Sequence, residues 1–263
     1  MQRLRRLVQR KSVRNADRVF VAEGAKVVEA ALASGASVEA LYFDSAGALT
    51  DNTAAIVDQA TSAGIRVFAL APGVMDRVAD TVTPQPLIAV VSYLDIDLDQ
   101  VVDGAVVVLV DVRDPGNVGA IIRSADAAGA AAVVICEGSG DPYNPKTVRA
   151  SAGSLFHLPL VRGGTFGEVA ATLTAMKFQL VGAVAHGGAD YASFDFGPRP
   201  AIVFGNEAAG LGAETLATLD QLITVPIAGG AESLNVAMAA TVISFELARR
   251  RRLGTSSPLS MTP

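Results

Sequence analysis

The sequence predicts an α/β protein made of a small α/β unit followed by a larger unit with a mostly parallel sheet. Three observations predict this fold class. Short apolar runs alternate with helical periods along the chain. The runs after residue 105 are apolar throughout, as is typical of strands covered on both faces. The acidic stretch LDIDLDQVVDG, residues 94–104, separates the two sets of elements and indicates a linker.

The whole chain has 263 residues, of which 51% are hydrophobic, which is enough for a sizeable core. Its first unit, residues 1–93, contains four apolar runs and two helical periods. Each helical period ends at a glycine suited to a helix C-terminus, Gly35 or Gly64. We expect strands at 18–24, 38–43, 65–70 and 86–93, and helices at 26–35 and 53–64.

The second unit, residues 105–253, contains five apolar runs with helical segments between them, which favours a parallel sheet. The expected strands are 105–110, 131–136, 178–184, 200–205 and 222–227. The polar tail at 254–263 is predicted to be disordered.

Composition excludes several protein classes. No apolar stretch reaches the length of a membrane span. Cys136 is the single cysteine and lies in an apolar run, so we expect a buried thiol and a reducing, cytoplasmic setting. His157 and His186 lie far apart without ligand spacing, so no metal site is predicted.

Charge is unevenly distributed along the chain. The net charge is −5, yet residues 1–18 carry seven Lys or Arg, and residues 249–252 are four arginines in a row. Such local basic patches suit phosphate partners. A solvated tail, or a helix end that favours cations, explains each patch taken alone equally well.

A turn and a helix follow the strand expected at 105–110. Residues 114–116, Asp-Pro-Gly, form the turn, and Asn117 suits the helix N-cap. Gly119 lies one helical turn before Arg123, which leaves space beside that arginine for another group. A capped helix with a surface arginine also fits this stretch.

The strand expected at 200–205 ends in a glycine-rich loop, GNEAAGLG at 205–212. These glycines indicate either close approach of a ligand or positive φ angles. A dinucleotide fingerprint fails because Thr215 stands where its last glycine belongs, which disfavours a nucleotide-dependent oxidoreductase. Neither a P-loop nor a nucleophile elbow occurs.

The strand expected at 222–227 also ends in a glycine loop, and a helix follows it. Ser233 suits the cap of that helix, whose apolar residues predict burial on most sides. Glu232 and Asn235 near its start would then need polar partners. The three loops follow strand ends, so we expect them to meet at one edge of the sheet.

Three motifs in these loops resemble the SpoU/TrmH branch of the SPOUT RNA methyltransferases. The pattern N-x-G-x-x-x-R matches residues 117–123, and G-N-E-x-x-G-L matches residues 205–211. A proline, a glycine loop and E-S-L-N-V match residues 226–236, although Ala237 stands where many members have serine. R-x-F-x-x-E-G at 18–24 resembles the substrate-binding domain of the ribosomal RNA members.

The resemblance implies a trefoil-knotted catalytic domain at 105–253, an RNA substrate-binding domain at 1–93 and a homodimer whose active site draws on both subunits. It implies S-adenosylmethionine as cofactor and a ribose 2′-O-methyl group as product, most often in 23S rRNA. Two alternatives stay open: a tRNA 2′-O-methyltransferase, and a non-catalytic RNA-binding or ribosome-assembly factor on the same fold. By position, the cofactor would contact Gly205, Asn206, Gly210, Val225, Ile227 and Leu234.

The resemblance also implies catalytic roles. Arg123 takes the position of the proposed general base. Since a guanidinium pKa lies above about 12, Arg123 could instead stabilise the developing alkoxide or hold a phosphate. Glu207, Ser233 and Asn235 would orient Arg123 and the ribose, and Asn117 would fix the first motif loop.

Overall fold

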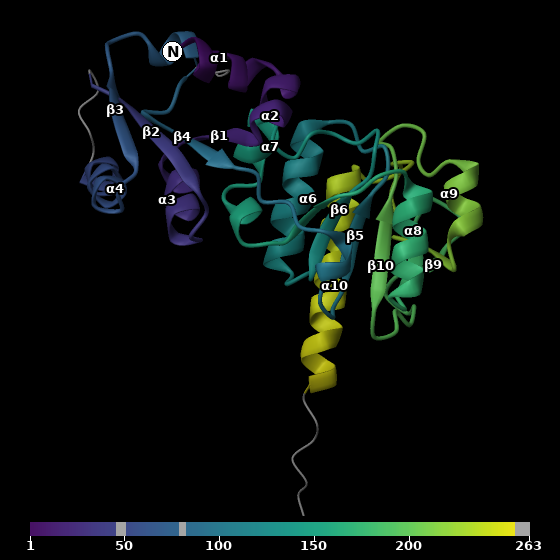
Figure 1. Ribbon diagram of the computed structural model, residues 1–263. Helices are drawn as coiled ribbons and strands as arrows, with labels where there is room; N and C mark the ends of the chain where they lie inside the picture. Colours follow the sequence, from purple (N-terminus) through teal and green to yellow (C-terminus); the bar gives the residue numbers. More distant parts are fainter. Residues whose placement is uncertain (46–50, 79–82, 256–263) are drawn as a thin grey trace, which may run out of the picture. The chain divides into compact units, whose positions relative to one another are not determined.

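The computed structural model describes residues 1–45, 51–78 and 83–255 (Figure 1). The chain packs as two compact units that are interleaved in sequence. The first unit contains Met1–Ile96, Arg113–Arg123 and Ser139–Leu160. The second unit contains Asp97–Val112, Ser124–Gly138 and the chain from Val161 onward.

The first unit is built on a four-stranded sheet with the order β1-β4-β2-β3. Strand β4 is antiparallel to β1 and β2, and β2 is parallel to β3. Helix α3 packs on β1 and β4, and α4 packs on β2 and β3. These elements confirm the six predicted ones, with the bounds β1 Val19–Glu23, α3 Ala25–Ala33, β2 Val38–Asp44, α4 Asp51–Ser62, β3 Arg66–Leu70 and β4 Leu87–Ser92.

The basic N-terminus forms two helices, α1 (Gln2–Gln9) and α2 (Lys11–Asp17). Helix α1 is amphipathic: Leu4 and Leu7 join a core cluster with Ile88 of β4, and its arginines stay exposed. The short helix α5 (Met75–Val78) completes this cluster. The N-terminal cations therefore lie on these helices or directly at their ends, and not on a loose tail.

Residues 139–160 pack against the N-terminal elements as part of the first unit. They contain α7 (Pro145–Ala150) and η2 (Ser154–Phe156). Tyr143 is fully buried, stacks on Tyr93 at 4.0 Å between ring centroids and donates a hydrogen bond to Asp95. Arg14 is 2% exposed, and its guanidinium binds Asp141 at 2.6 Å.

The second unit is built on a seven-stranded sheet with the order β7-β6-β5-β10-β8-β11-β9. The pairs from β6 to β9 along this order are all parallel, which confirms the predicted parallel sheet. The five predicted strands are β5 Val106–Leu109, β6 Ala132–Ile135, β8 Gln179–Ala183, β10 Pro200–Phe204 and β11 Gln221–Thr224. The edge strands β7 (Leu160–Arg162) and β9 (Ala189–Asp190) are too short for a sequence pattern to predict.

Helices and a 3₁₀ turn connect these strands. Their bounds are η1 Leu98–Gln100, α6 Pro115–Ala127, α8 Phe166–Ala175, α9 Ala213–Thr218 and α10 Val236–Thr255. Helix α8 packs on β8, and α9 packs on α8. Ser124 and Thr241 form a hydrogen bond of 2.6 Å between α6 and α10. No helix in the described ranges is long and apolar enough to cross a membrane.

Helix α10 differs from its prediction. Burial on most sides was expected, but Met238 is 62% exposed and Phe245 is 44% exposed. Only the face with Ala240, Ile243 and Leu247 is buried, because the helix packs on the rest of the unit along one side. The helix continues to Thr255, and residues 256–263 of the predicted tail lie outside the described residues.

Candidate active site

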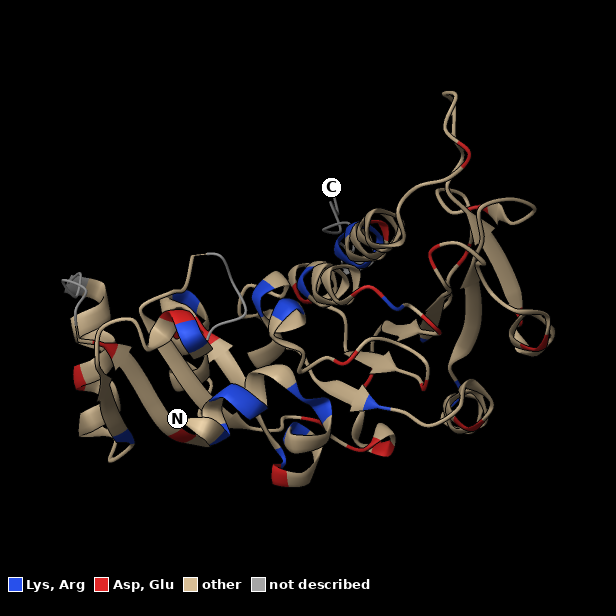
Figure 2. Ribbon diagram, turned by 90° about the horizontal axis from the view of Figure 1, so that it is seen from above, with Lys and Arg blue, Asp and Glu red and all other residues tan. Residues whose placement is uncertain are grey.

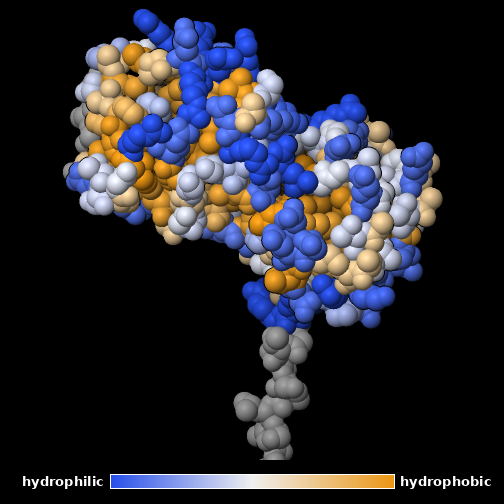
Figure 3. Space-filling view, viewed as in Figure 1, coloured by the Kyte–Doolittle hydropathy of each residue, from blue (hydrophilic) through white to orange (hydrophobic). Residues whose placement is uncertain are grey.

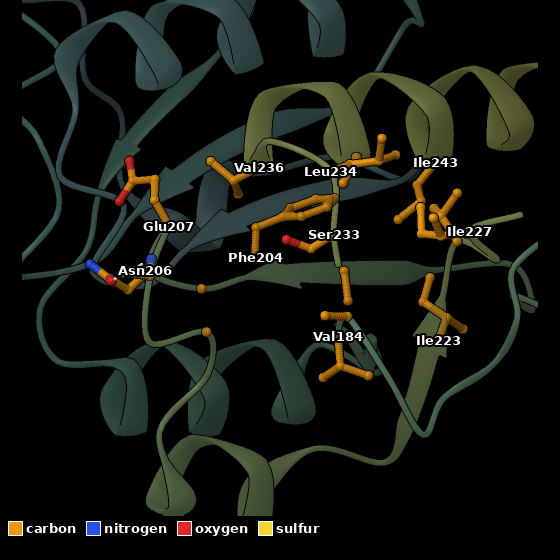
Figure 4. A pocket seen from close by; sticks show the side chains of 17 residues that line it. Val184, Phe204, Asn206, Glu207, Ile223, Ile227, Ser233, Leu234, Val236 and Ile243 are labelled. Atoms are coloured by element: carbon orange, nitrogen blue, oxygen red, sulfur yellow. Dashed lines mark hydrogen bonds between the residues drawn. The ribbon is translucent and has the colours of Figure 1, made fainter. Parts of the chain in front are cut away.

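A cavity lies at the carboxyl ends of three parallel strands, β8, β10 and β11, within the second unit (Figure 4). All six residues predicted to contact a cofactor line it, together with the predicted catalytic residues Glu207 and Ser233. The second and third motif loops therefore meet at one edge of the sheet, as ligand loops of parallel sheets do.

The loop after β10 closes on itself through Asn206. The Asn206 and Gly210 backbones exchange hydrogen bonds of 3.0 and 2.9 Å. The Asn206 side chain accepts from the Ala208 and Ala209 amides and donates to the Asp111 carbonyl after β5 at 2.9 Å. Asn206 thus fixes the loop, and Glu207 stands exposed at the cavity.

The glycines of this loop have a local explanation. A Cβ on Gly205 would lie 2.5 Å from the Gly210 carbonyl group. Gly210 has a φ of +66°, in the region that favours glycine. The tight turn of the loop itself therefore requires both glycines, whatever ligand the cavity takes.

The loop after β11 carries Val225, Ile227, Ser233 and Leu234 to the cavity. The cap of α10 is Asn235, whose Oδ1 accepts from the Ala237 amide at 2.9 Å. The prediction of Ser233 as the cap was wrong, because the helix begins at Val236 and only Asn235 stands directly before it. The predicted buried start was also wrong, since Glu232, Ser233 and Asn235 are all exposed.

Sequence reasoning missed one wall of the cavity. Ala183, Val184 and Ala185 at the end of β8 line it. The Val184 amide donates to the Ile223 carbonyl, and the Thr224 hydroxyl donates to the Ala185 carbonyl, both at 2.9 Å. Alanine and valine side chains have no polar or reactive group, so they do not form a recognisable motif. The available signal was the position of this segment at the end of a predicted parallel strand.

The first motif does not line the cavity, and Asn117 and Arg123 belong to the first unit. Asp114 is the cap of α6: its Oδ1 accepts from the Asn117 amide at 3.0 Å. The prediction of Asn117 as the cap was therefore wrong, because Pro115 takes the first helical position. The Lys146 ammonium, 2.8 Å from Asp114, holds the pKa of that carboxyl below its usual range.

Gly119 serves packing within the first unit. A Cβ there would lie 2.5 Å from the Thr147 carbonyl oxygen and 2.6 Å from the Ala150 Cβ. The predicted space beside Arg123 is thus occupied by α7 on the Gly119 side. Arg123 itself is exposed, and its side chain has no hydrogen bond or ion pair with any residue in the described ranges.

The cavity is polar at one end and apolar at the other. Figure 4 shows Asn206 and Glu207 at one end and Ile223, Ile227 and Ile243 at the other. An elongated ligand with a flat apolar group and a charged group fits this distribution. Among the described residues, no three His, Cys, Asp or Glu are grouped so as to hold a metal ion.

A cavity lined by glycine-containing loops at the carboxyl ends of parallel strands is typical of α/β proteins that bind a ligand there. The sequence profile of the SpoU rRNA methylase family matches residues 104–245, and that of the MRM3-like substrate binding domain matches residues 1–89. The chain belongs to the SpoU rRNA methylase family and is a methyltransferase, which confirms the resemblance found in the sequence.

Similar proteins cover almost the whole chain. The 23S rRNA (guanosine(2553)-2′-O)-methyltransferase RlmP of Bacillus subtilis is 36% identical over 90% of this chain and 91% of its own. A 23S rRNA (uridine(2479)-2′-O)-methyltransferase of Streptomyces viridochromogenes is 35% identical over 90% of this chain and 85% of its own. The crystal structure of the SpoU methyltransferase AviRb from the same species, in complex with AdoMet, has a TM-score of 0.86 at 33% identity, covering 95% of this chain and 97% of AviRb.

Proposed function

We propose that this protein transfers a methyl group from S-adenosylmethionine to a ribose 2′-hydroxyl of 23S rRNA. One observation carries the proposal: the second and third family motifs meet around a single cavity at the strand ends. Two relatives named for this reaction on 23S rRNA match 90% of the chain. A cytoplasmic location, where ribosomal RNA is found, belongs to the same proposal.

The lining of the cavity fits the chemistry of S-adenosylmethionine. Its apolar end, with Ile223, Ile227 and Ile243, suits the flat adenine ring. Glu207 at the polar end suits a cationic group. When bound, the cofactor supplies a methyl group on a sulfonium centre, which leaves readily.

The chain's own residues would then align the ribose and manage its proton. We assign Arg123 to the hydroxyl as the group that stabilises the developing negative charge, because a guanidinium stays protonated at neutral pH. Glu207 and Ser233, at the cavity, would orient the ribose. Asn235 would act mainly by capping the start of α10, which fixes the position of the preceding residues Ser233 and Leu234.

The activity test uses purified protein and methyl-labelled S-adenosylmethionine with protein-free 23S rRNA, 16S rRNA and bulk tRNA. We expect label in 23S rRNA, recovered after alkaline hydrolysis as a resistant dinucleotide, because a methylated 2′-oxygen cannot attack the neighbouring phosphate. Label in tRNA alone would replace the proposed substrate. Cofactor binding without label in any RNA would favour the assembly factor.

Arg123→Ala should lower methyl transfer by at least about a hundredfold while cofactor affinity stays close to that of the unaltered protein. Cofactor affinity should be kept because Arg123 lies outside the lining of the cavity. Single-turnover methylation and calorimetric cofactor binding measure the two effects. Lys26→Ala, which removes an exposed cation of α3, is the control for loss of charge alone. Full activity in Arg123→Ala would remove it from the catalytic group.

We also propose that the protein is a homodimer that pairs through α10. Four large apolar side chains exposed in the described structure lie in or just before this helix: Leu234, Met238, Phe245 and Leu253. The spacing of seven and eight residues from Met238 through Phe245 to Leu253 keeps these three on one helical face. Large exposed apolar side chains that share one helical face are typical of an interface.

Phe245→Glu should convert the dimer to a monomer, because a carboxylate in an apolar interface loses its hydration without gaining a partner. Light scattering coupled to gel filtration measures the mass. Val102→Glu, at a site 70% exposed and distant in sequence from α10, is the matched control. A monomeric unaltered protein at micromolar concentration would contradict the dimer.

A further inference from the structure

The sheet of the first unit exposes an aromatic pair. Phe68 on the edge strand β3 is 42% exposed, and its ring stacks on Tyr42 of β2 with centroids 5.2 Å apart and planes inclined by 21°. Tyr42 in turn packs against the core cluster that contains Leu4 and Leu7 of α1. One face of the Phe68 ring therefore rests on Tyr42, and the exposed part of the ring lies on the α1 side of the sheet.

Charged side chains connect this aromatic pair to the N-terminal helices. Arg66, two residues before Phe68 and thus on the same strand face, binds Glu39 at 2.9 Å. Arg3 of α1 binds the same carboxylate through two nitrogens at 2.7 and 3.0 Å and binds Asp17 at 2.9 Å. Two acids balance two arginines, so the network itself is neutral.

Excess positive charge lies next to this network on α1 and α2. Arg3 borders a groove between these helices, together with Arg6 and Ser12. Four exposed cations have side chains that make no hydrogen bond or ion pair within the described ranges: Arg5, Arg6, Arg10 and Lys11. Figure 2 shows Lys and Arg gathered on the helices beside the N-terminus. Figure 3 shows hydrophobic and hydrophilic surface side by side over α1, β2 and β3.

We propose that Phe68, supported by Tyr42, stacks an unpaired base of the RNA substrate while the free cations of α1 and α2 hold the adjoining phosphates. An exposed ring with a rigid backing and neighbouring cations is the surface that single-stranded RNA recognition uses. The proposal rests on the proposed function for the identity of the partner. It adds where, and through which group, the first unit contacts unpaired RNA.

Two substitutions separate stacking from general packing. Phe68→Leu keeps an apolar side chain on the edge strand and removes the ring, whereas Phe68→Trp keeps a ring. Fluorescence anisotropy is measured with a labelled unstructured RNA of about 12 nucleotides and with a duplex of the same length. We expect Phe68→Leu to weaken binding of the single strand by at least about fivefold, with little change for the duplex. Phe68→Trp should bind the single strand as the unaltered protein does.

Further measurements keep the outcome distinct from the proposed function. Phe68→Leu should raise the KM for 23S rRNA and leave kcat and cofactor affinity unchanged, and Val102→Leu is the control substitution at another exposed apolar site. Unaltered single-strand affinity in a folded Phe68→Leu protein overturns the stacking proposal. So does a loss of affinity seen only with ribosomal particles, which would indicate a protein partner. If the unaltered protein methylates no RNA, the proposed function fails, and the binding comparison still decides the stacking proposal.

Discussion

Gly119 allows α6 to pack closely against α7. A Cβ at this position would lie 2.5 Å from the Thr147 carbonyl oxygen. Helix α7 therefore fills the space that the sequence predicts one turn before Arg123. The family motif thus contains a packing requirement beside an exposed arginine. For this glycine, a match to the family motif does not mean contact with a ligand.

Gly119→Ala should destabilise the protein by about 1–3 kcal/mol, because the added methyl group forces α6 and α7 apart. Urea unfolding measures the change. Gly167→Ala is the matched control: it lies in α8, and a Cβ there meets nothing within 4 Å. That substitution should stabilise the protein by up to about 1 kcal/mol. Equal effects of the two would contradict the packing explanation.

At the scale of elements, helix α10 contacts several parts of the second unit. Its first residues follow the loop that lines the cavity, and Arg251 near its end donates to the Ala128 and Gly129 carbonyls after α6. Arg250 donates to the Ala192 carbonyl at 2.6 Å and also to the Phe194 carbonyl of the same segment. Glu246 orients Arg250 at 2.6 Å.

This arginine cluster predicts a pH dependence. Hydrogen bonds from Arg249, then from Arg250, lower the pKa of Glu246 from 4.5 to about 2. A carboxyl whose pKa is lower in the folded protein contributes stability above its unfolded pKa, and that stability is lost as pH falls from 4.5 toward 2. Glu246→Gln removes this contribution. The loss of urea midpoint between neutral pH and pH 3, roughly the middle of that window, should therefore be smaller in the variant.

Glu29→Gln is the control for this measurement, because Glu29 is exposed and has no ionic partner among the described residues. Its midpoint should fall with pH as much as that of the unaltered protein. An identical pH profile for Glu246→Gln and the unaltered protein would show that the arginine cluster adds no stability.

The sequence was informative for elements and less so for their ends. Every predicted strand exists, since alternation and apolar runs record burial directly. Two caps were misplaced by two or three residues: Asn117 for Asp114, and Ser233 for Asn235. Asp, Asn and Ser are all good caps, so only the observed start of the helix decides among them.

The candidate site was predictable where polar or glycine motifs mark it. The wall formed by Ala183, Val184 and Ala185 at the end of β8 could not be predicted, because these residues contribute only backbone and small apolar surface. The exposure of Met238 and Phe245 could not be predicted either, since the same apolar residue types occur on exposed helix faces and in cores. The trefoil knot stays a prediction from the family.

At the scale of the whole molecule, a buried ion pair joins residues 127 positions apart. Arg14 lies in α2, and its guanidinium binds Asp141 and also donates to the Leu7 and Val8 carbonyls. Both side chains are almost fully buried. Loss of one partner would leave a charge without hydration or compensation.

Arg14→Met should therefore lower the free energy of unfolding by about 3–5 kcal/mol. Arg3→Met, which removes the exposed pairs with Asp17 and Glu39, should cost less than about 1 kcal/mol. Equilibrium denaturation of the two variants, read by circular dichroism, measures the difference. A mild effect of Arg14→Met would mean that water reaches Asp141.

The interleaving of the two units has a consequence for synthesis on the ribosome. Residues 1–96 emerge first, but Tyr143, Asp141 and Arg149, which pair with Asp95, Arg14 and Glu23, are made later. Translation at about 5–20 residues per second delays these partners by several seconds. During that interval Arg14 lacks its later partner Asp141, and Glu23 lacks its later partner Arg149. Folding of the first unit is thus completed only after residue 160 has left the exit tunnel.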